Sequence, residues 1–241
     1  MRILALETSA KAVSAAVTED GKVLCSGYQD TGLTHSRTLM PIVEAMLKNT
    51  GLTVQDCDAV AVAAGPGSFT GIRIGVSAAK GLAFAADKPC AAVSTLEAMA
   101  RNVAHMDALV VCAMDARRSQ VYNACFRGTG EGLERLTPDR AIGLPELAAE
   151  LKNRENPQIL VGDGALLCYT TFKEQGLDVR LAPPHLRYQS AWGVARAALE
   201  QARTGALTDA QGLVPVYHRL SQAERERLEK LRAEETAEKT R

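Results

Sequence analysis

The feature that most constrains the fold is an internal repeat of one order of elements. Residues 1–103 carry three strand patterns, a helix pattern, a buried strand, a glycine-rich turn and a second helix, and residues 104–190 repeat that order in a shorter form. The two copies align at Glu7 and Asp115, the acids that end their first strands. Self-similarity of this kind indicates a duplicated unit, and mixed strand and helix periodicity indicates an α/β protein. The sequence therefore predicts two related α/β domains.

Each copy is expected to begin with strands separated by polar turns. Pro41 places the regular start of the first helix near Thr38, because proline fits only in the first turns of a helix. In the first copy the predicted strands are 3–6, 13–18, 23–28 and 59–64, and the predicted helices are 36–49 and 71–86. In the second copy the predicted strands are 109–114, one opening at Val121, and 159–161, and the predicted helix is 144–152.

The last part of the chain lies outside the repeat. A helix is expected at 190–202 and an irregular or extended segment at 211–220. We expect residues 191–218 to pack back on the first domain, and residues 219–241 to form a charged, solvated tail.

Composition excludes several classes of protein. The 28 basic and 28 acidic side chains cancel, which argues against a protein that grips nucleic acid through a strong basic field alone. The apolar runs are too short for a membrane span or a signal peptide. The six cysteines include no C-x-x-C pair, and the four histidines show no metal-ligand spacing. We therefore expect a cytoplasmic protein with reduced cysteines and no bound metal.

The glycine-rich turn at 65–71 allows two interpretations. A glycine turn between a buried strand and a helix N-terminus leaves backbone amides free to hold an anion, but the turn lacks the Gly-Lys-Ser/Thr of a phosphate loop. The alternative is a tight turn whose glycines permit close packing. If the turn binds a nucleotide or another anion, the candidate residues are Glu7, Thr8, Ser9, Gly65, Gly67 and Ser68.

The helix that follows the turn is rich in small residues. Gly71, Gly75, Ala79 and Ala83 fall on one i,i+4 ridge, where another backbone can approach closely. Two interpretations are open: the ridge is covered within the chain, or it is a docking surface for another chain. On the second interpretation Gly75→Leu is expected to abolish docking and leave the isolated fold intact.

Charged residues at the strand ends also have two interpretations. Glu7 and Asp115 could hold Mg²⁺ or a water beside a nucleotide, or each could bond to the backbone amides of its own turn. The neighbouring Arg117 and Arg118 could meet phosphate or form an exposed turn.

Several motifs together carry a resemblance to one family. They are 3–9, HSRTLMP at 35–41, GPGSFTGIRIG at 65–75, VSTLE at 93–97, DARR at 115–118 and PVY at 215–217. The chain resembles the bacterial TsaB (YeaZ) family over nearly its whole length up to about Arg219, and GPGSFTGIRIG is the most specific part of the match. The resemblance implies the duplicated actin-like (ASKHA, ribonuclease H-like) two-domain fold.

The resemblance also implies a function. Members of the family are required subunits of the machinery that places threonylcarbamoyl on the adenosine beside the tRNA anticodon. The catalytic subunit is a paralogue, TsaD, which binds a metal through His-x-x-x-His and uses threonylcarbamoyl-AMP, and the ATPase TsaE takes part. Thr95 and Met99 stand where the two histidines of the paralogue would be. A hydroxyl and a thioether are poor replacements for imidazoles, so the resemblance implies a non-catalytic sibling.

The same resemblance implies how the chain meets its partners. Relatives dock on the paralogue through two helices of the N-terminal domain, and this face forms a homodimer when the paralogue is absent. Contact with tRNA is expected to be indirect. The docking residues in this sequence would be His35, Leu39, Ile42, Val43, Met46, Gly71, Ile72, Gly75 and Ala79.

Two enzymatic alternatives stay open beside this interpretation. An actin-like ATPase would rely on Glu7 and Asp115, and its hydrolysis of ATP would be lost on Glu7→Ala. A metallopeptidase would copurify with a stoichiometric metal. Glu7, Thr8 and Ser9 replace the Asp and glycines that nucleotide-binding relatives have in this turn, so no cofactor is expected for the chain alone.

Overall fold

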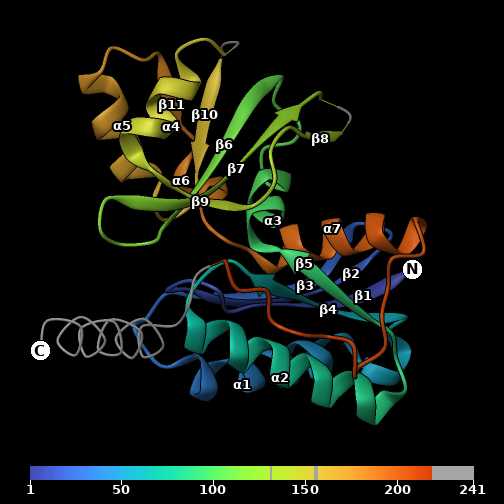
Figure 1. Ribbon diagram of the computed structural model, residues 1–241. Coiled ribbons are helices and arrows are strands. Elements are labelled where there is room, and N and C mark those ends of the chain that lie inside the picture. Colours follow the sequence, from blue (N-terminus) through green and yellow to red (C-terminus); the bar gives the residue numbers. More distant parts are fainter. Residues whose placement is uncertain (131, 155–156, 219–241) are drawn as a thin grey trace, which may run out of the picture.

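The computed structural model describes residues 1–130, 132–154 and 157–218 (Figure 1). The charged tail that the sequence predicts at 219–241 lies entirely outside the described residues. Within the described part of the chain, no helix is long and apolar enough to cross a membrane.

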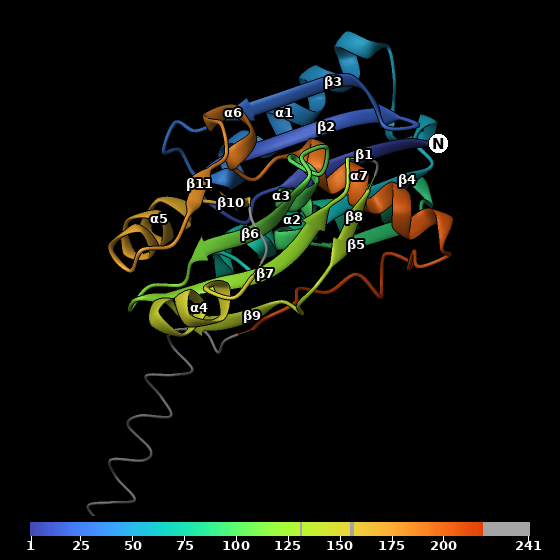
Figure 2. The same cartoon turned by 90° about the horizontal axis from the view of Figure 1, so that it is seen from above.

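The first unit is a five-stranded sheet with the strand order β3-β2-β1-β4-β5, which Figure 2 shows side by side. The first three strands are antiparallel, and β1, β4 and β5 run parallel. Its elements are β1 (Arg2–Glu7), β2 (Val13–Glu19), β3 (Lys22–Gln29), α1 (His35–Thr50), a 3₁₀ turn (Val54–Asp56), β4 (Ala59–Gly65), α2 (Phe69–Ala86), β5 (Cys90–Ser94) and α3 (Thr95–Arg101).

The second unit repeats this topology. Its sheet has the order β11-β10-β6-β7-β8, with β9 paired to β7, so β6, β7, β10 and β11 take the places of β1, β2, β4 and β5. The elements are β6 (Ala108–Asp115), β7 (Gln120–Gly128), β8 (Leu133–Arg135), β9 (Arg140–Gly143), α4 (Leu144–Leu151), β10 (Gln158–Val161), α5 (Ala165–Glu174), β11 (Val179–Leu181) and α6 (Pro184–Arg187). The predicted duplicated α/β fold is confirmed.

Both faces of the first sheet are covered, which explains why its strands are apolar throughout. Side chains alternate along β1, so that Leu4 and Leu6 face α1 and α2 while Ile3 and Ala5 face α7 (Ala191–Arg203). Figure 1 shows α1 and α2 below this sheet and α7 above it. The C-terminal part of the chain therefore returns to the first unit, as the sequence predicts, although the domain limits themselves stay a prediction.

Both faces of the second sheet are also covered by helices, and one of these helices, α3, precedes the sheet in the chain. One face packs on α4 and α5 through Leu147 and Phe172, and the other packs on α3 through Leu96 and Met99. Helices α3 and α7 also contact each other, which joins the two units. Each sheet thus has one face covered by a helix that lies outside its own run of strands along the chain. This helix is α7 for the first sheet and α3 for the second.

The structure corrects the predicted start of the first helix. Helix α1 begins at His35, before Thr38, and takes Pro41 into its interior. The missing amide of Pro41 costs the helix one hydrogen bond, while the apolar face of α1 packs on the sheet and offsets this loss. The sequence also missed the short elements β5, α3, β9, β11 and α6.

Candidate functional site

The small-residue ridge of α2 faces the interior of the chain. A Cβ atom added to Gly71 would collide with the carbonyl oxygen of Thr8, and one added to Gly75 would collide with the Thr8 hydroxyl. The same hydroxyl donates a hydrogen bond to the carbonyl oxygen of Gly71 at 2.8 Å. The ridge is therefore covered within the chain. The expectation that Gly75→Leu leaves the fold intact is wrong, because the position has no space for a side chain.

Most of the side chains predicted for docking share this inward orientation. They form the core between the helix pair and the sheet, and only His35 is partly exposed. The buried positions are Leu39, Ile42, Val43, Met46, Gly71, Ile72, Gly75 and Ala79. In the fold as it stands Leu39 lines a surface groove and a partner cannot touch the other buried positions, so those residues are corrected although the predicted helices remain candidates.

The outer face of the same helix pair is apolar and accessible. A groove of about 520 Å³ runs between the N-terminal parts of α1 and α2. Ser77, Gly81 and Ala85 form a second i,i+4 stripe on the outside of α2, and a Cβ at Gly81 would meet open space. Beside them, Met40 is 42% exposed and Phe84 is 76% exposed. The groove is lined by His35, Ser36, Leu39, Met40, Phe69, Thr70, Arg73, Ile74, Ser77 and Ala78.

An extended C-terminal segment borders this outer face. The Tyr217 ring stacks on Phe69 with centroids 5.0 Å apart, and the Arg73 guanidinium lies 3.9 Å from the centroid of Phe69. Arg73 also donates from Nε to the Tyr217 hydroxyl at 2.9 Å. The Val216 amide donates to the carbonyl oxygen of Ala64 at 2.8 Å, which fixes the segment to the end of β4. Over residues 211–218 the predicted irregular conformation is confirmed.

The contacts of the glycine-rich turn favour its interpretation as a tight turn. A Cβ at Gly67 would collide with the carbonyl oxygen of Ser9, and one at Gly65 with that of Val216. The Ser68 amide already donates to the Ser9 carbonyl at 2.7 Å, and the Ser68 hydroxyl accepts from the Gly71 amide as the N-cap of α2. The glycines therefore serve close backbone contacts, and at least one amide of the turn is not available to an anion.

Glu7 and Asp115 occupy the same position in the two units but have different environments. Glu7 is 1% exposed, and its Oε1 accepts the Ser9 amide at 2.6 Å while no described residue bonds its buried Oε2. Burial raises the pKa of Glu7 to about 7, Asp163 adds to the rise, and the hydrogen bonds from Ser9 oppose it. Asp115 is exposed and accepts the Arg117 amide at 2.7 Å. Both acids thus bond to their own turns.

The residues available for metal chemistry are few. Thr95 and Met99 are both fully buried in α3. Among residues 1–130, 132–154 and 157–218, no group of three His, Cys, Asp or Glu side chains is arranged to hold a metal ion. All six cysteines are free, and five of them are buried, as the sequence predicts.

The sequence and the fold can be compared with known proteins. Residues 29–226 match the family model of TsaD, tRNA N6-adenosine threonylcarbamoyltransferase. The tRNA threonylcarbamoyladenosine biosynthesis protein TsaB of Bacillus subtilis is 34% identical over 228 residues, which cover 93% of this chain and 96% of that protein. The TsaB of Escherichia coli is 34% identical over 75% of this chain and 79% of its own length.

Solved structures agree with this assignment. YeaZ from Pseudomonas aeruginosa has a TM-score of 0.73 at 27% identity and covers 90% of this chain and 100% of its own. The predicted recognition and the actin-like fold class are confirmed. The chain belongs to the TsaD-type family and, within it, to the TsaB (YeaZ) group of tRNA threonylcarbamoyladenosine biosynthesis proteins.

Proposed function

We propose that this chain is a non-catalytic subunit for the transfer of threonylcarbamoyl from threonylcarbamoyl-AMP to the adenosine beside the tRNA anticodon. It binds and supports a TsaD-type catalytic paralogue in the cytoplasm, together with a TsaE-type ATPase. When the paralogue is absent, the same surface forms a homodimer. The observation that carries the proposal is the accessible apolar face of α1 and α2.

The chemistry of this face suits the close approach of other helices. The stripe of Ser77, Gly81 and Ala85 lets a partner backbone come near α2, while Met40 and Phe84 offer large apolar side chains beside it. A monomeric protein rarely exposes a contiguous apolar surface of this kind without a partner. The stripe lies on the opposite side of α2 from Gly71 and Gly75, so docking leaves the core unchanged.

The donor chemistry of α3 supports a non-catalytic role. The positions where the paralogue would carry its two histidines hold the buried Thr95 and Met99, and a hydroxyl and a thioether bind a hard or borderline cation weakly. Free cysteines are typical of a reducing compartment, which supports the cytoplasmic location.

Calorimetric titration with the purified paralogue of the same organism tests this proposal. We expect micromolar or tighter binding with a negative heat-capacity change, because the interface buries apolar surface. Gly81→Leu should weaken binding at least tenfold, since it fills the stripe without disturbing the core. Thr170→Leu, at an exposed position of α5 in the second unit, is the matched control and should bind as the wild type does.

Either of two results would overturn the proposal. If the wild type fails to bind the paralogue with the ATPase and ATP present, the partner role is wrong. If the wild type binds and Gly81→Leu binds equally tightly, docking does not use the outer face of α2.

A further inference from the structure

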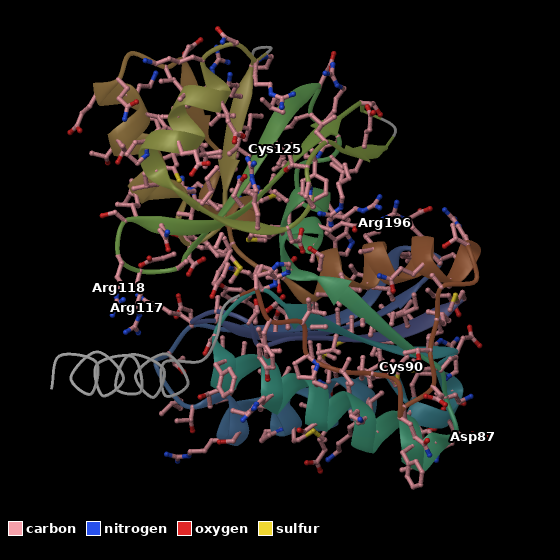
Figure 3. All side chains as sticks on the ribbon, in the orientation of Figure 1. Asp87, Cys90, Arg117, Arg118, Cys125 and Arg196 are labelled. Carbon is pink, nitrogen blue, oxygen red and sulfur yellow. The ribbon has the colours of Figure 1, made fainter. Side chains whose placement is uncertain are left out.

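The turn between β6 and β7 carries two adjacent arginines, Arg117 and Arg118. Arg117 and Arg118 are both exposed, and Figure 3 shows them together at the tip of the second unit, pointing away from it. Elsewhere in this unit Arg135 pairs with Glu97 and Asp139, and Arg140 pairs with Glu150. Among the described residues, no carboxylate pairs with either arginine of the turn, so their charge is available to an external anion.

The backbone of this turn holds an unfavourable conformation. Arg117, Arg118 and Ser119 have φ angles of 63°, 56° and 56°, in the left-handed region that side chains with a Cβ rarely adopt. Hydrogen bonds from the surroundings maintain it: Asp115 accepts the Arg117 amide at 2.7 Å, and the carbonyl oxygen of Ser119 accepts the Leu144 amide at 3.2 Å. Backbone strain that the surrounding fold enforces is found preferentially at functional positions.

The turn lies at the same edge of the molecule as the corresponding turn of the first unit. Both follow the carboxyl end of the first strand in their unit, and Asp163 lies close to both. Lys11 lowers the pKa of Asp163 and Asp115 raises it, although burial is the main cause of its raised value. Lys11 is also exposed, so Lys11, Arg117 and Arg118 place three cations on the two turns.

These cations also lie on the side where the docking groove begins. The His35 ring, which lines the groove, is hydrogen-bonded through Nε2 to the carbonyl oxygen of Ala10 at 2.8 Å, next to Lys11. In Figures 1 and 3 the β6–β7 turn is at the left, where α2 also begins. The turn and the start of the groove therefore lie on the same side of the molecule.

From this arrangement we infer that Arg117 and Arg118 contact the phosphate backbone of tRNA directly. The inference rests on the proposed function, and it differs from the indirect contact that the resemblance implies. Two exposed guanidinium groups on a projecting turn suit an extended polyanion, because each can bond a phosphate without being buried. The chain carries no net charge, so the contact adds to the affinity of the complex and does not provide all of it.

The test measures tRNA binding by the complex of this chain with the paralogue between 50 and 200 mM salt. The probe is an unmodified transcript of a tRNA that has adenosine beside the anticodon. The double variant Arg117→Ala/Arg118→Ala should bind about tenfold more weakly, and the slope of log affinity against log salt should fall by roughly 1.4 to 1.8 for two lost phosphate contacts. Alanine keeps the Cβ atom, so the backbone cost of the turn is unchanged.

Two further variants make the result specific. Arg180→Ala/Arg203→Ala removes the same charge from exposed positions on β11 and α7 and should leave both tRNA affinity and the slope near the wild-type values. Arg117→Lys/Arg118→Lys keeps the charge and should recover most of the salt dependence.

Failure of this inference is distinguishable from failure of the proposed function. If the alanine variant binds the paralogue and tRNA as the wild type does, the inference is wrong and the proposed function stands. If the variant loses affinity for the paralogue instead, the arginines contact protein and the RNA contact is wrong. If the wild type does not bind the paralogue, the same transcript and variants are compared on the chain alone, and equal affinities overturn the inference.

Discussion

The two units share one sheet topology but differ in the length of their helices. Helices α1 and α2 have 16 and 18 residues, whereas their counterparts α4 and α5 have 8 and 10. At 1.5 Å per residue, α2 is about 27 Å long and α5 about 15 Å. The additional turns give the first unit an outer face long enough for another protein. The two units thus share one topology, and helix length is what distinguishes the helix pairs that cover their sheets.

The turns that follow β1 and β6 also differ between the two units. In the first unit, Glu7 is buried on the sheet face that it shares with Ile3 and Ala5, while in the second unit Asp115 is exposed beside two arginines. The same position therefore holds a carboxyl group with a raised pKa in one copy and a surface turn in the other. The two acids therefore differ in burial, and the second prediction below tests the consequence for stability.

The largest expected effect concerns the inner ridge of the longer helix. Gly75→Leu should lower the free energy of unfolding by about 3 kcal/mol or more, because the side chain collides with Thr8 and lies close to Val62. Urea denaturation measures the change. Gly81→Leu, on the outer stripe of the same helix, is the control and should be at least as stable to urea as the wild type. Equal losses in both variants would contradict the division of α2 into an inner and an outer face.

The second prediction compares the two acids. Glu7 has a pKa of about 7 when folded and an ordinary value near 4.5 when unfolded, so the folded state binds the proton more tightly. Stability from this group is complete below pH 4.5 and is lost as the pH rises to 7, by about 3 kcal/mol in total. Glu7→Gln should remove this loss and exceed the wild type in stability at pH 8 but not at pH 5.

Denaturation curves at both pH values give the required comparison. Asp115→Asn changes the equivalent exposed acid and should keep the wild-type dependence on pH. A Glu7→Gln variant whose stability still falls between pH 5 and pH 8 like that of the wild type would show that the burial of Glu7 does not set this dependence.

A smaller effect is expected at the start of α2. Ser68 caps this helix by accepting the Gly71 amide at 3.2 Å, while the N-cap of α5 is Gly164 and offers no side chain. Ser68→Ala should cost about 1 kcal/mol, and Ser68→Gly, which makes the first unit like the second, only a few tenths. Thermal unfolding of the two variants distinguishes these values, and a loss near zero in both would mean that the cap bond contributes little.

The smallest effect is a gain in stability. Gly81 lies on the exposed face in the interior of α2, and a Cβ there meets nothing within 4 Å. Gly81→Ala should therefore raise the free energy of unfolding by roughly 0.5 to 1 kcal/mol, because alanine loses less backbone entropy in a helix than glycine does. Urea denaturation of the isolated chain measures it. A loss of stability would show that some part of the chain packs on this stripe.

The repeated order of elements could be predicted because the apolar periodicity of each strand and helix depends only on residues that are neighbours along the chain. It could not assign the faces of α2, since Gly71, Gly75 and Ala79 on one side are as small as Ser77, Gly81 and Ala85 on the other. Only the position of Thr8, which is distant along the chain, makes the first ridge internal. The same limit applies to the contact of Arg73 with Tyr217, whose partners are 144 residues apart. Short elements such as β5 and α3 lack enough residues to show a period.

The packing of α7 has a consequence for how the chain is made. The face of the first sheet that includes Ile3, Ala5 and Ala63 is covered mainly by α7, which the ribosome synthesises about a hundred residues after β5. At a rate of about 5 to 20 residues per second, the growing chain holds this face uncovered for roughly 5 to 20 seconds. The first sheet is therefore synthesised first but is the last to be fully covered. During that interval its apolar face is exposed, and a chaperone would protect it.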